Sequence, residues 1–388
     1  MNTALIAKTC TATQGFLRTP GTPVNRDAAT HMREIERLVQ NFDRKQLALE
    51  NSQALRGGNE LLRNGFRQFY NPEEMLERKK WARSLPSDSQ RTIEASLKQA
   101  ELLGPMRRVA VAPSARVLDI LLIDFPNFAE VTRLIQRRLA LCRCAPEQLF
   151  GLPPILLDGP PGVGKTAYSK RLAKILAIAY DEVDISKGSA SFAITGLDSG
   201  YSNGRAGSLW NTLNSGDGCM SCLILLDELD KSRASRDDHL GFLYGLLEPE
   251  SATRFQDSAL LLPIDASRIS WIATCNDTDR VDSALLSRFE VLRVELPTKE
   301  EMPTVVASIH RELLSKSDWS CAFDPNLSGS IVELLSGHSP RLIRRALEAA
   351  YANAAFHGRH SLKRDDLQFR GEGCRNARQP MGFIHNGQ

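Results

Sequence analysis

The residues best suited to chemistry lie in one short glycine-rich segment that follows an apolar run. They are Gly159, Pro160, Pro161, Gly162, Val163, Gly164, Lys165, Thr166 and Ala167. Glycines let successive backbone N–H groups turn inward around phosphate oxygens, and a helix that begins directly after them adds the positive end of its dipole. We expect Lys165 to reach the β- and γ-phosphates of a nucleotide and the Thr166 hydroxyl to bind Mg²⁺. The segment therefore predicts a phosphate-binding loop.

Two adjacent carboxylates, Asp227 and Glu228, stand at the end of the apolar run 222–227. In a parallel sheet, the carboxyl end of such a strand faces the phosphate loop. There Asp227 would bind Mg²⁺ through water, and Glu228 would polarise an attacking water as general base. Two such carboxylates can also cap a helix, but their place after a buried strand and a phosphate loop indicates hydrolysis of Mg–ATP.

Three further polar residues stand at positions suited to the same chemistry. Asn276 follows the apolar run 268–275 and could orient the water beside Glu228. Arg288 comes just before the last predicted strand, at the rim of the domain, where its charge suits the nucleotide site of a neighbouring subunit. Arg341 lies near the start of a late helix and could reach the γ-phosphate. For both arginines a surface salt bridge is the alternative.

These residues need a scaffold, and short apolar runs alternate with amphipathic stretches through the middle of the chain. The pattern is typical of a parallel sheet covered by helices on both faces. The predicted strands are 154–158, 179–185, 222–227, 268–275 and 290–296, with a helix from 164. Later helices are expected at about 299–316, 325–336 and 339–356. The sequence therefore predicts an α/β fold followed by a small helical lid.

The same patterns divide the chain into five segments. We expect a disordered start (1–26), a helical N-terminal region (27–115), an α/β nucleotide-binding domain (116–298), a helical lid (299–370) and a disordered tail (371–388). Within the N-terminal region, apolar residues fall on helical steps, but over too short a stretch to make a coiled coil convincing.

Composition narrows the classes of function. The formal charge is +3 and charged residues make up 24% of the chain, so charge gives no general case for nucleic acid or an anionic membrane as the partner. No stretch reaches the roughly 18 uninterrupted apolar residues that a membrane helix needs. Eight cysteines without a secretory signal favour reduced thiols. The expectation is a soluble, cytoplasmic protein.

Taken in order, the motifs resemble the ATPase module of Lon proteases, a branch of the AAA+ ATPases. The resemblance runs over about residues 125–370 and rests on GPPGVGKT, LLDELDK, LLEPESATRFQDSALLLPIDASRISWIATCND and ALLSRFEVLRVELP. It implies the P-loop NTPase (AAA+) fold, ATP and Mg²⁺ as cofactors, and a homo-oligomeric ring, expected to be a hexamer. The residues that take the family's nucleotide roles are Lys165, Thr166, Asp227, Glu228, Asn276, Arg288 and Arg341.

The resemblance also gives a role to Tyr201, which lies in the glycine-rich stretch ITGLDSGYSNGRAG. In Lon proteins this segment carries an aromatic residue that lines the central pore, and a tyrosine can hold any passing peptide without reading its sequence. The glycines are expected to let the loop move during ATP hydrolysis. Ser202 and Asn203 depart from the apolar and glycine residues usual there, so the grip is expected to differ. The alternative is a solvent-exposed loop tyrosine.

The expected function is an ATP-dependent motor that remodels or unfolds a protein substrate by threading it through a ring. After the lid the sequence offers too few residues for the Lon peptidase, so a Lon-like motor without its own protease domain is expected. Two alternatives stay open. One is a nucleotide-switched loader or regulator of a nucleic-acid or protein complex. The other is the ATPase subunit of a protease whose peptidase, or adaptor, is a separate chain.

Overall fold

The computed structural model describes residues 65–187, 190–201, 203–234 and 240–369. The predicted start (1–26), the first part of the predicted helical region (27–64) and the predicted tail (371–388) lie outside the described residues. All described residues fall within one compact unit of the chain, residues 57–388. None of the helices in these ranges is long and apolar enough to cross a bilayer.

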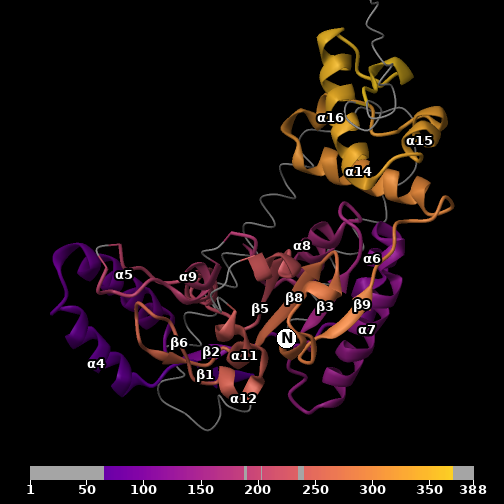
Figure 1. The fold of residues 1–388 in the computed structure, drawn as a ribbon. Coiled ribbons are helices and arrows are strands. Elements are labelled where there is room, and N and C mark those ends of the chain that lie inside the picture. Colours follow the sequence, from indigo (N-terminus) through magenta and orange to yellow (C-terminus); the bar gives the residue numbers. More distant parts are fainter. Residues whose placement is uncertain (1–64, 188–189, 202, 235–239, 370–388) are drawn as a thin grey trace, which may run out of the picture. The chain divides into compact units, whose positions relative to one another are not determined.

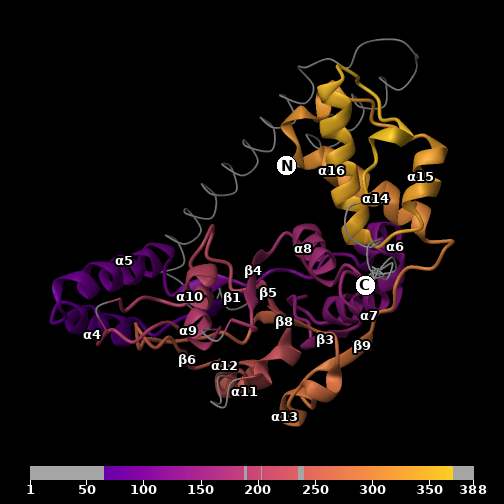
Figure 2. The same ribbon diagram turned by 45° about the horizontal axis from the view of Figure 1, so that its top comes forward.

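The centre of the fold is a five-stranded sheet in the order β4-β5-β8-β3-β9; Figure 1 labels β5, β8, β3 and β9, and Figure 2 also labels β4. All neighbouring strands pair in parallel, as the alternation of apolar runs and helices predicts. The strands are β3 (Ile155–Asp158), β4 (Ala179–Asp184), β5 (Cys222–Asp227), β8 (Ile269–Cys275) and β9 (Glu290–Arg293). Because the strands are parallel, their carboxyl ends meet at one edge.

Helices bury both faces of the sheet, which explains why its central strands are apolar at successive positions. Leu223 and Leu225 of β5 share one hydrophobic cluster with residues of α7 and α8. Ile224 and Leu226 share the other with residues of α10 and α11. The helices of the first face are α6 (Asp119–Asp124), α7 (Ala129–Cys144) and α8 (Lys165–Leu176). Those of the second are α9 (Ala190–Thr195), α10 (Ser208–Leu213) and α11 (Gly241–Leu247).

The described part of the N-terminal region contains the expected helices, α4 (Pro72–Ala82) and α5 (Ser87–Leu103). It also contains a two-stranded antiparallel sheet, β1 (Phe66–Gln68) with β2 (Met106–Arg108), which was not predicted from the sequence. Each strand has three residues, too few for the alternation that reveals a strand in sequence. Apolar residues of α4 and α5 belong to the same cluster as α10, beside which they lie in Figure 2.

The lid has a hydrophobic core of its own, to which α14 (Met302–Lys316), α15 (Gly329–Leu335) and α16 (Pro340–Phe356) contribute. Between α11 and β9 lie α12 (Pro249–Ala252), the antiparallel pair β6 (Phe255–Gln256) and β7 (Pro263–Ile264), and α13 (Ser283–Leu286). Short 3-10 helices span Ala115–Leu118, Pro126–Phe128, Leu229–Ala234, Thr278–Arg280, Asp318–Ala322 and Arg364–Asp366.

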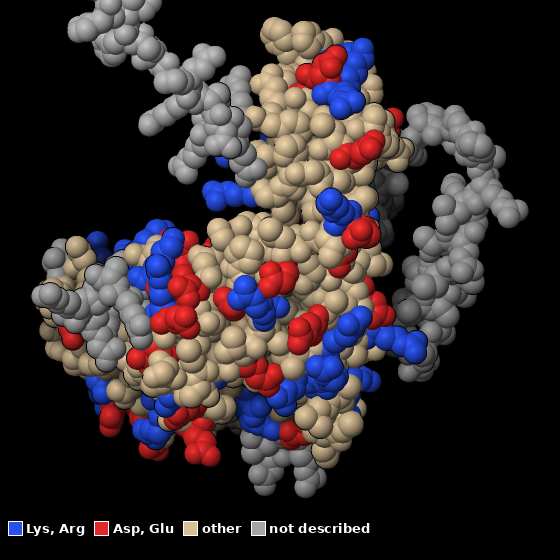
Figure 3. Space-filling model, turned by 45° about the vertical axis from the view of Figure 1, so that its right-hand side comes forward, with Lys and Arg blue, Asp and Glu red and all other residues tan. Residues whose placement is uncertain are grey.

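Acidic and basic side chains are interspersed over the face of the molecule that Figure 3 shows. No single-sign field dominates that face, in keeping with the small formal charge of +3. The charge distribution on this face therefore marks no binding site, and ligand-binding sites usually lie in clefts.

Candidate nucleotide-binding site

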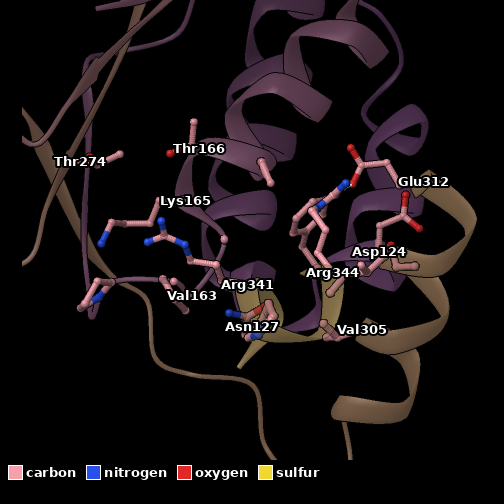
Figure 4. Close-up of a pocket in the computed structure, with 18 of the residues that line it drawn as sticks. Asp124, Asn127, Val163, Lys165, Thr166, Thr274, Val305, Glu312, Arg341 and Arg344 are labelled. Carbon is pink, nitrogen blue, oxygen red and sulfur yellow. Dashed lines mark hydrogen bonds and ion pairs between the residues drawn. The ribbon is translucent and has the colours of Figure 1, made fainter. Parts of the chain in front are cut away.

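A cleft of about 370 Å³ lies where the phosphate loop, the carboxyl edge of the sheet and the lid meet (Figure 4). Most of the residues singled out in the sequence line it. They are Pro161, Gly162, Val163, Gly164, Lys165, Thr166, Ala167, Asp227, Glu228, Asn276 and Arg341. Gly159 and Pro160 do not line the cleft, but their carbonyl oxygens accept hydrogen bonds from Lys165 Nζ. The structure thus brings together residues that are far apart in the chain.

The phosphate loop has the backbone that its glycines allow. Gly162 and Gly164 have φ angles of +82° and +112°, which side chains of L-residues rarely adopt. Gly159 is needed for space, because a Cβ there would lie 2.2 Å from the carbonyl oxygen of Val294. Helix α8 begins at Lys165 directly after this turn, so its free N–H groups point at whatever the loop encloses.

The Lys165 side chain is buried, and its ammonium is held by oxygens of the loop and of Asn276, which directly follows β8. It donates to Gly159 O at 2.5 Å and to Asn276 Oδ1 at 3.1 Å. Burial lowers the pKa of Lys165, although nearby anionic groups oppose the shift. Asn276 therefore contacts Lys165 in this structure rather than Glu228. A phosphate entering the loop would offer this cation a stronger, charged partner than the neutral oxygens it now contacts.

Asp227 ends β5 beside the loop and faces two hydroxyl groups. Thr166 Oγ1 donates to its Oδ2 at 3.4 Å, and Thr274 Oγ1 donates to its Oδ1 at 2.5 Å. A carboxylate and a hydroxyl are ligands that Mg²⁺ accepts, with water and phosphate oxygens completing the shell. Among the described residues no group of three or more His, Cys, Asp or Glu side chains could hold a metal. The donor set thus fits a magnesium ion that arrives with a nucleotide.

Glu228 has an unusual backbone, with a φ angle of +61°, which is costly for a side chain of this kind. Its N–H donates to Thr274 Oγ1 at 3.0 Å, and its carboxylate pairs with Lys231 Nζ at 2.6 Å. Thr274, a cleft residue that was not predicted from the sequence, therefore contacts the carboxylate of Asp227 and the backbone of Glu228. It lies two residues before Asn276 on β8, and that spacing on a buried strand is the signal that could have revealed it.

Part of the cleft wall is apolar and was not anticipated from sequence. Phe125, Val305 and Ile309 line it, together with the amide residue Asn127. A flat aromatic base is recognised by such surfaces, with a few polar groups fixing its orientation. Phe125 and Asn127 follow α6, whereas Val305 and Ile309 belong to α14 of the lid. The sequence alone does not show that these two distant segments meet at the cleft.

The lid contributes charges to the cleft from α14 and α16. Arg341 stands at the start of α16, and Figure 4 shows its guanidinium pointing into the same part of the cleft as Lys165. Arg344, one turn later, pairs with Glu312 of α14. Burial acts to raise the pKa of Glu312, but Lys316 and Arg344 outweigh it and the pKa is lowered. Arg341 is thus the cation of the lid best placed to meet a phosphate.

Asp124, another cleft residue, joins the lid to the core. This buried carboxylate of α6 accepts from Arg171 of α8 at 3.2 Å and from Arg311 of α14 at 3.0 Å. Arg171 belongs to the core and Arg311 to the lid. Asp124 therefore links nucleotide-facing parts of core and lid through charged hydrogen bonds, which are stronger than neutral ones.

Arg288 does not line the cleft. Its guanidinium pairs with Glu248 at 2.7 Å, donates to Ala284 O at 2.7 Å, and lies 5.1 Å from the ring centre of Tyr244. Its Nε is buried and has no hydrogen-bond partner among the described residues. The structure keeps Arg288 away from the nucleotide site of its own chain.

Tyr201 also lies outside the cleft, at the tip of a closed loop, with 65% of its surface exposed. Leu197 and Arg205 close the loop by exchanging backbone hydrogen bonds of 2.9 and 3.1 Å. A Cβ at Gly204 would lie 2.6 Å from the Cα of Ser199, and a Cβ at Gly207 would meet backbone at 2.1 Å. At these two positions glycine permits close packing rather than the flexibility that the sequence suggests.

The chain is similar in sequence to known proteins over the part that carries the phosphate loop and the strands of the sheet. Residues 155–296 match the family described as "ATPase family associated with various cellular activities (AAA)". Lon protease homolog 2, peroxisomal, of Eremothecium gossypii is 35% identical over 159 residues, and the Lon protease of Methylocella silvestris is 30% identical over 195 residues. These alignments cover 39% and 50% of this chain but only 16% and 23% of the relatives.

A solved structure shares the fold at low sequence identity. The chain resembles the S. cerevisiae Hsp104:casein complex in its extended conformation with a TM-score of 0.50 and 14% identity, over 73% of this chain and 53% of that one. At this level the similarity concerns the fold.

Proposed function

We propose that the chain, whose residues 155–296 match a family of AAA ATPases, uses hydrolysis of Mg–ATP to remodel or unfold protein substrates. One observation carries the proposal: Lys165, Asp227, Glu228 and Arg341 converge on a single cleft that is large enough for a nucleotide. The sequence similarity to Lon proteases supports it in the same region.

In this proposal each side chain of the cleft has a distinct task. Lys165 leaves its carbonyl partners to neutralise the β- and γ-phosphates, and Arg341 approaches them from the lid. Thr166 and Asp227 hold the magnesium ion, which supplies positive charge against the phosphate oxygens. Glu228 exchanges Lys231 for a water molecule and accepts its proton, with Asn276 nearby to orient that water.

We also propose that a neighbouring copy of the chain completes the site. Arg288 lies outside its own cleft, and a guanidinium supplied across an interface stabilises transition-state charge effectively. Head-to-tail contacts of this kind close into rings, and a hexamer is the form that the Lon resemblance favours. Each subunit would then hydrolyse ATP only when its neighbour supplies Arg288.

The substrate in this proposal is an unfolded polypeptide, held by Tyr201. The exposed ring of Tyr201 on a closed loop is suited to non-specific contact with a peptide backbone and its side chains. Movement of the lid relative to the core in each cycle would displace the loop and pull the polypeptide.

The test is ATP turnover by the purified chain with and without casein. We expect casein to stimulate the parent chain and Tyr201→Phe, which keeps the ring, but not Tyr201→Ala. Lys165→Ala should lose nucleotide binding altogether. Casein stimulation that survives in Tyr201→Ala would contradict the role of Tyr201, and binding of ATP by Lys165→Ala at the parent affinity would contradict the site.

A further inference from the structure

Asp257 is a buried carboxylate, 0% exposed, that the nucleotide site does not use. It follows β6 and accepts three backbone hydrogen bonds. Oδ1 accepts from Ala259 N at 2.9 Å and Leu260 N at 3.2 Å, which shape its own turn. Oδ2 accepts from Gly207 N at 2.7 Å. A buried carboxylate is expensive unless its oxygens are satisfied, and here the third donor comes from a distant part of the chain.

That distant partner is the end of the loop that carries Tyr201. Gly207 is the last residue before α10, and the loop begins at Gly196, where a Cβ would lie only 2.6 Å from Asp257 Oδ1. Beside this contact, Ser258 N donates to Thr195 O at 2.7 Å. The carboxylate of Asp257 therefore lies against both ends of the loop and holds its base.

The tip of the same loop has a second support. Ser89 of α5 is buried and donates through its hydroxyl to the carbonyl oxygen of Tyr201 at 3.2 Å. Base and tip are thus fixed by residues from two other segments of the chain. The backbone under Tyr201 is held, while the ring itself projects into solvent.

We propose that Asp257 is a positioning residue that holds the Tyr201 loop ready for a polypeptide substrate and connects it to the β6–β7 segment. The proposal rests on the proposed function of Tyr201. A loop ordered in advance binds without the entropic cost of ordering it at each encounter. A loop fixed at its base also transmits movement of the core to the bound peptide, whereas a loose one absorbs it.

Asp257→Asn tests the proposal because it can keep the Oδ1 hydrogen bonds of the local turn while removing the Oδ2 hydrogen bond to Gly207 N. The amide oxygen of asparagine can replace Oδ1 and keep the local turn. Its NH₂ group then faces the N–H of Gly207, and because both groups are donors, no hydrogen bond can form between them. The substitution breaks the connection to the loop with little change of shape. Asp265→Asn is the matched control, because Asp265 lies in the same segment and its Oδ1 accepts a local bond from Ser267 N at 2.9 Å.

Two measurements read the result. In casein-stimulated ATP turnover, Asp257→Asn should raise the KM for casein by about tenfold and reduce kcat at saturating casein by less than about twofold. Amide hydrogen exchange should become faster in residues 197–207 of this variant and stay slow in β5. Asp265→Asn should match the parent chain in both.

Unchanged exchange in residues 197–207 of Asp257→Asn would overturn the proposal, whatever casein does. So would a parent-like KM for casein in that variant when Tyr201→Ala has lost stimulation. If the proposed function is wrong, casein will not stimulate ATP turnover by the parent chain, or Tyr201→Ala will still be stimulated. In that case the hydrogen-exchange measurement alone still decides whether Asp257 holds the loop.

Discussion

Lys165 and Glu228, two charged residues of the site, are held by other groups of the same chain. Lys165 contacts Gly159 O, Glu228 pairs with Lys231, and Arg288 lies beyond the cleft. Binding of a phosphate must therefore exchange internal hydrogen bonds for new ones rather than capture free side chains. The geometry is ordered before the ligand arrives, which lowers the cost of organising it during the reaction.

The Thr274 hydroxyl contacts both acidic residues of the cleft, Asp227 through its carboxylate and Glu228 through its backbone N–H. Thr274→Val keeps the shape but removes the hydroxyl that donates to Asp227 and accepts from Glu228 N. We expect ATP turnover to fall by about tenfold, equivalent to about 1.4 kcal/mol of activation free energy, with little change in the Kd for ATP. Steady-state turnover and equilibrium binding measure the two effects. Thr253→Val, whose exposed hydroxyl bonds only Glu250 O, is the control, and equal losses in both variants would contradict the assignment.

Asp257 should make the stability of the chain depend on pH. Burial raises the pKa of Asp257 to about 6 from an ordinary 3.8, although its three backbone N–H donors act to lower it. A carboxyl with a raised pKa favours folding while protonated, and this contribution is lost as pH rises from about 4 through 6. Relative to Asp257→Asn, the parent chain should lose on the order of 1 kcal/mol of unfolding free energy between pH 5 and pH 7.5. Urea titrations at these two values measure it, and a pH-independent difference would contradict the shift.

Among the elements, the junction of α5, β2 and α10 is organised by one buried cation. Arg107 is 2% exposed, and its guanidinium donates to Gly104 O, Ala100 O, Leu213 O and Asn214 Oδ1 at 2.8–3.2 Å. It also lies 3.7 Å from the ring centre of Phe69. Burial lowers the pKa of Arg107 to about 9. The guanidinium of Arg107 thus joins the end of α5 to the end of α10 by donating to neutral oxygens of both.

Arg107→Met should destabilise the chain, because a side chain of similar length would leave several buried oxygens without donors. We expect a loss of about 3 kcal/mol in the free energy of unfolding. The Kd for ATP should not change, because Arg107 does not line the cleft. Urea unfolding checks the first expectation and nucleotide binding the second. Arg91→Met on the exposed side of α5 is the control, and equal stability of the two variants would show that the junction does not depend on Arg107.

The pairing of α6 with α14 should set how firmly the lid closes on a nucleotide. Asp124→Asn removes the charge shared by Arg171 and Arg311, and we expect the Kd for ATP to rise by about tenfold, or 1.4 kcal/mol. Isothermal titration with ATP measures it. Asp119→Asn in the same helix, whose exposed carboxylate bonds Gln136, should keep the parent affinity. A parent-like Kd in Asp124→Asn would mean that this link does not control the cleft.

At the scale of the whole molecule, the sequence predicted best those features that depend on residues close together in the chain. The phosphate loop and the apolar strands could be predicted because glycine spacing and uninterrupted hydrophobic runs report on neighbouring residues. Phe125 and Asp257 could not, since the residues that they contact across the fold lie tens of residues away and no local pattern marks them. Thr274 was missed although it lies two residues before Asn276 on a buried strand. The strands β1 and β2 were missed because three residues are too few to show the alternation that marks a strand in sequence.

The central claim is that ATP is hydrolysed in a cleft completed by Arg288 of an adjacent copy. The most direct measurement is ATP turnover by two inactive variants, alone and mixed. Glu228→Gln lacks the general base but keeps Arg288, and Arg288→Ala lacks the arginine but keeps the base. Both should bind ATP and fail to hydrolyse it. In the mixture, the intact cleft of one variant meets the intact arginine of the other, so part of the parent turnover should return.

A mixture that stays as inactive as its components, although size-exclusion chromatography shows the two variants assembled together, would contradict the shared site. Turnover by Arg288→Ala alone at the parent rate would contradict it as well.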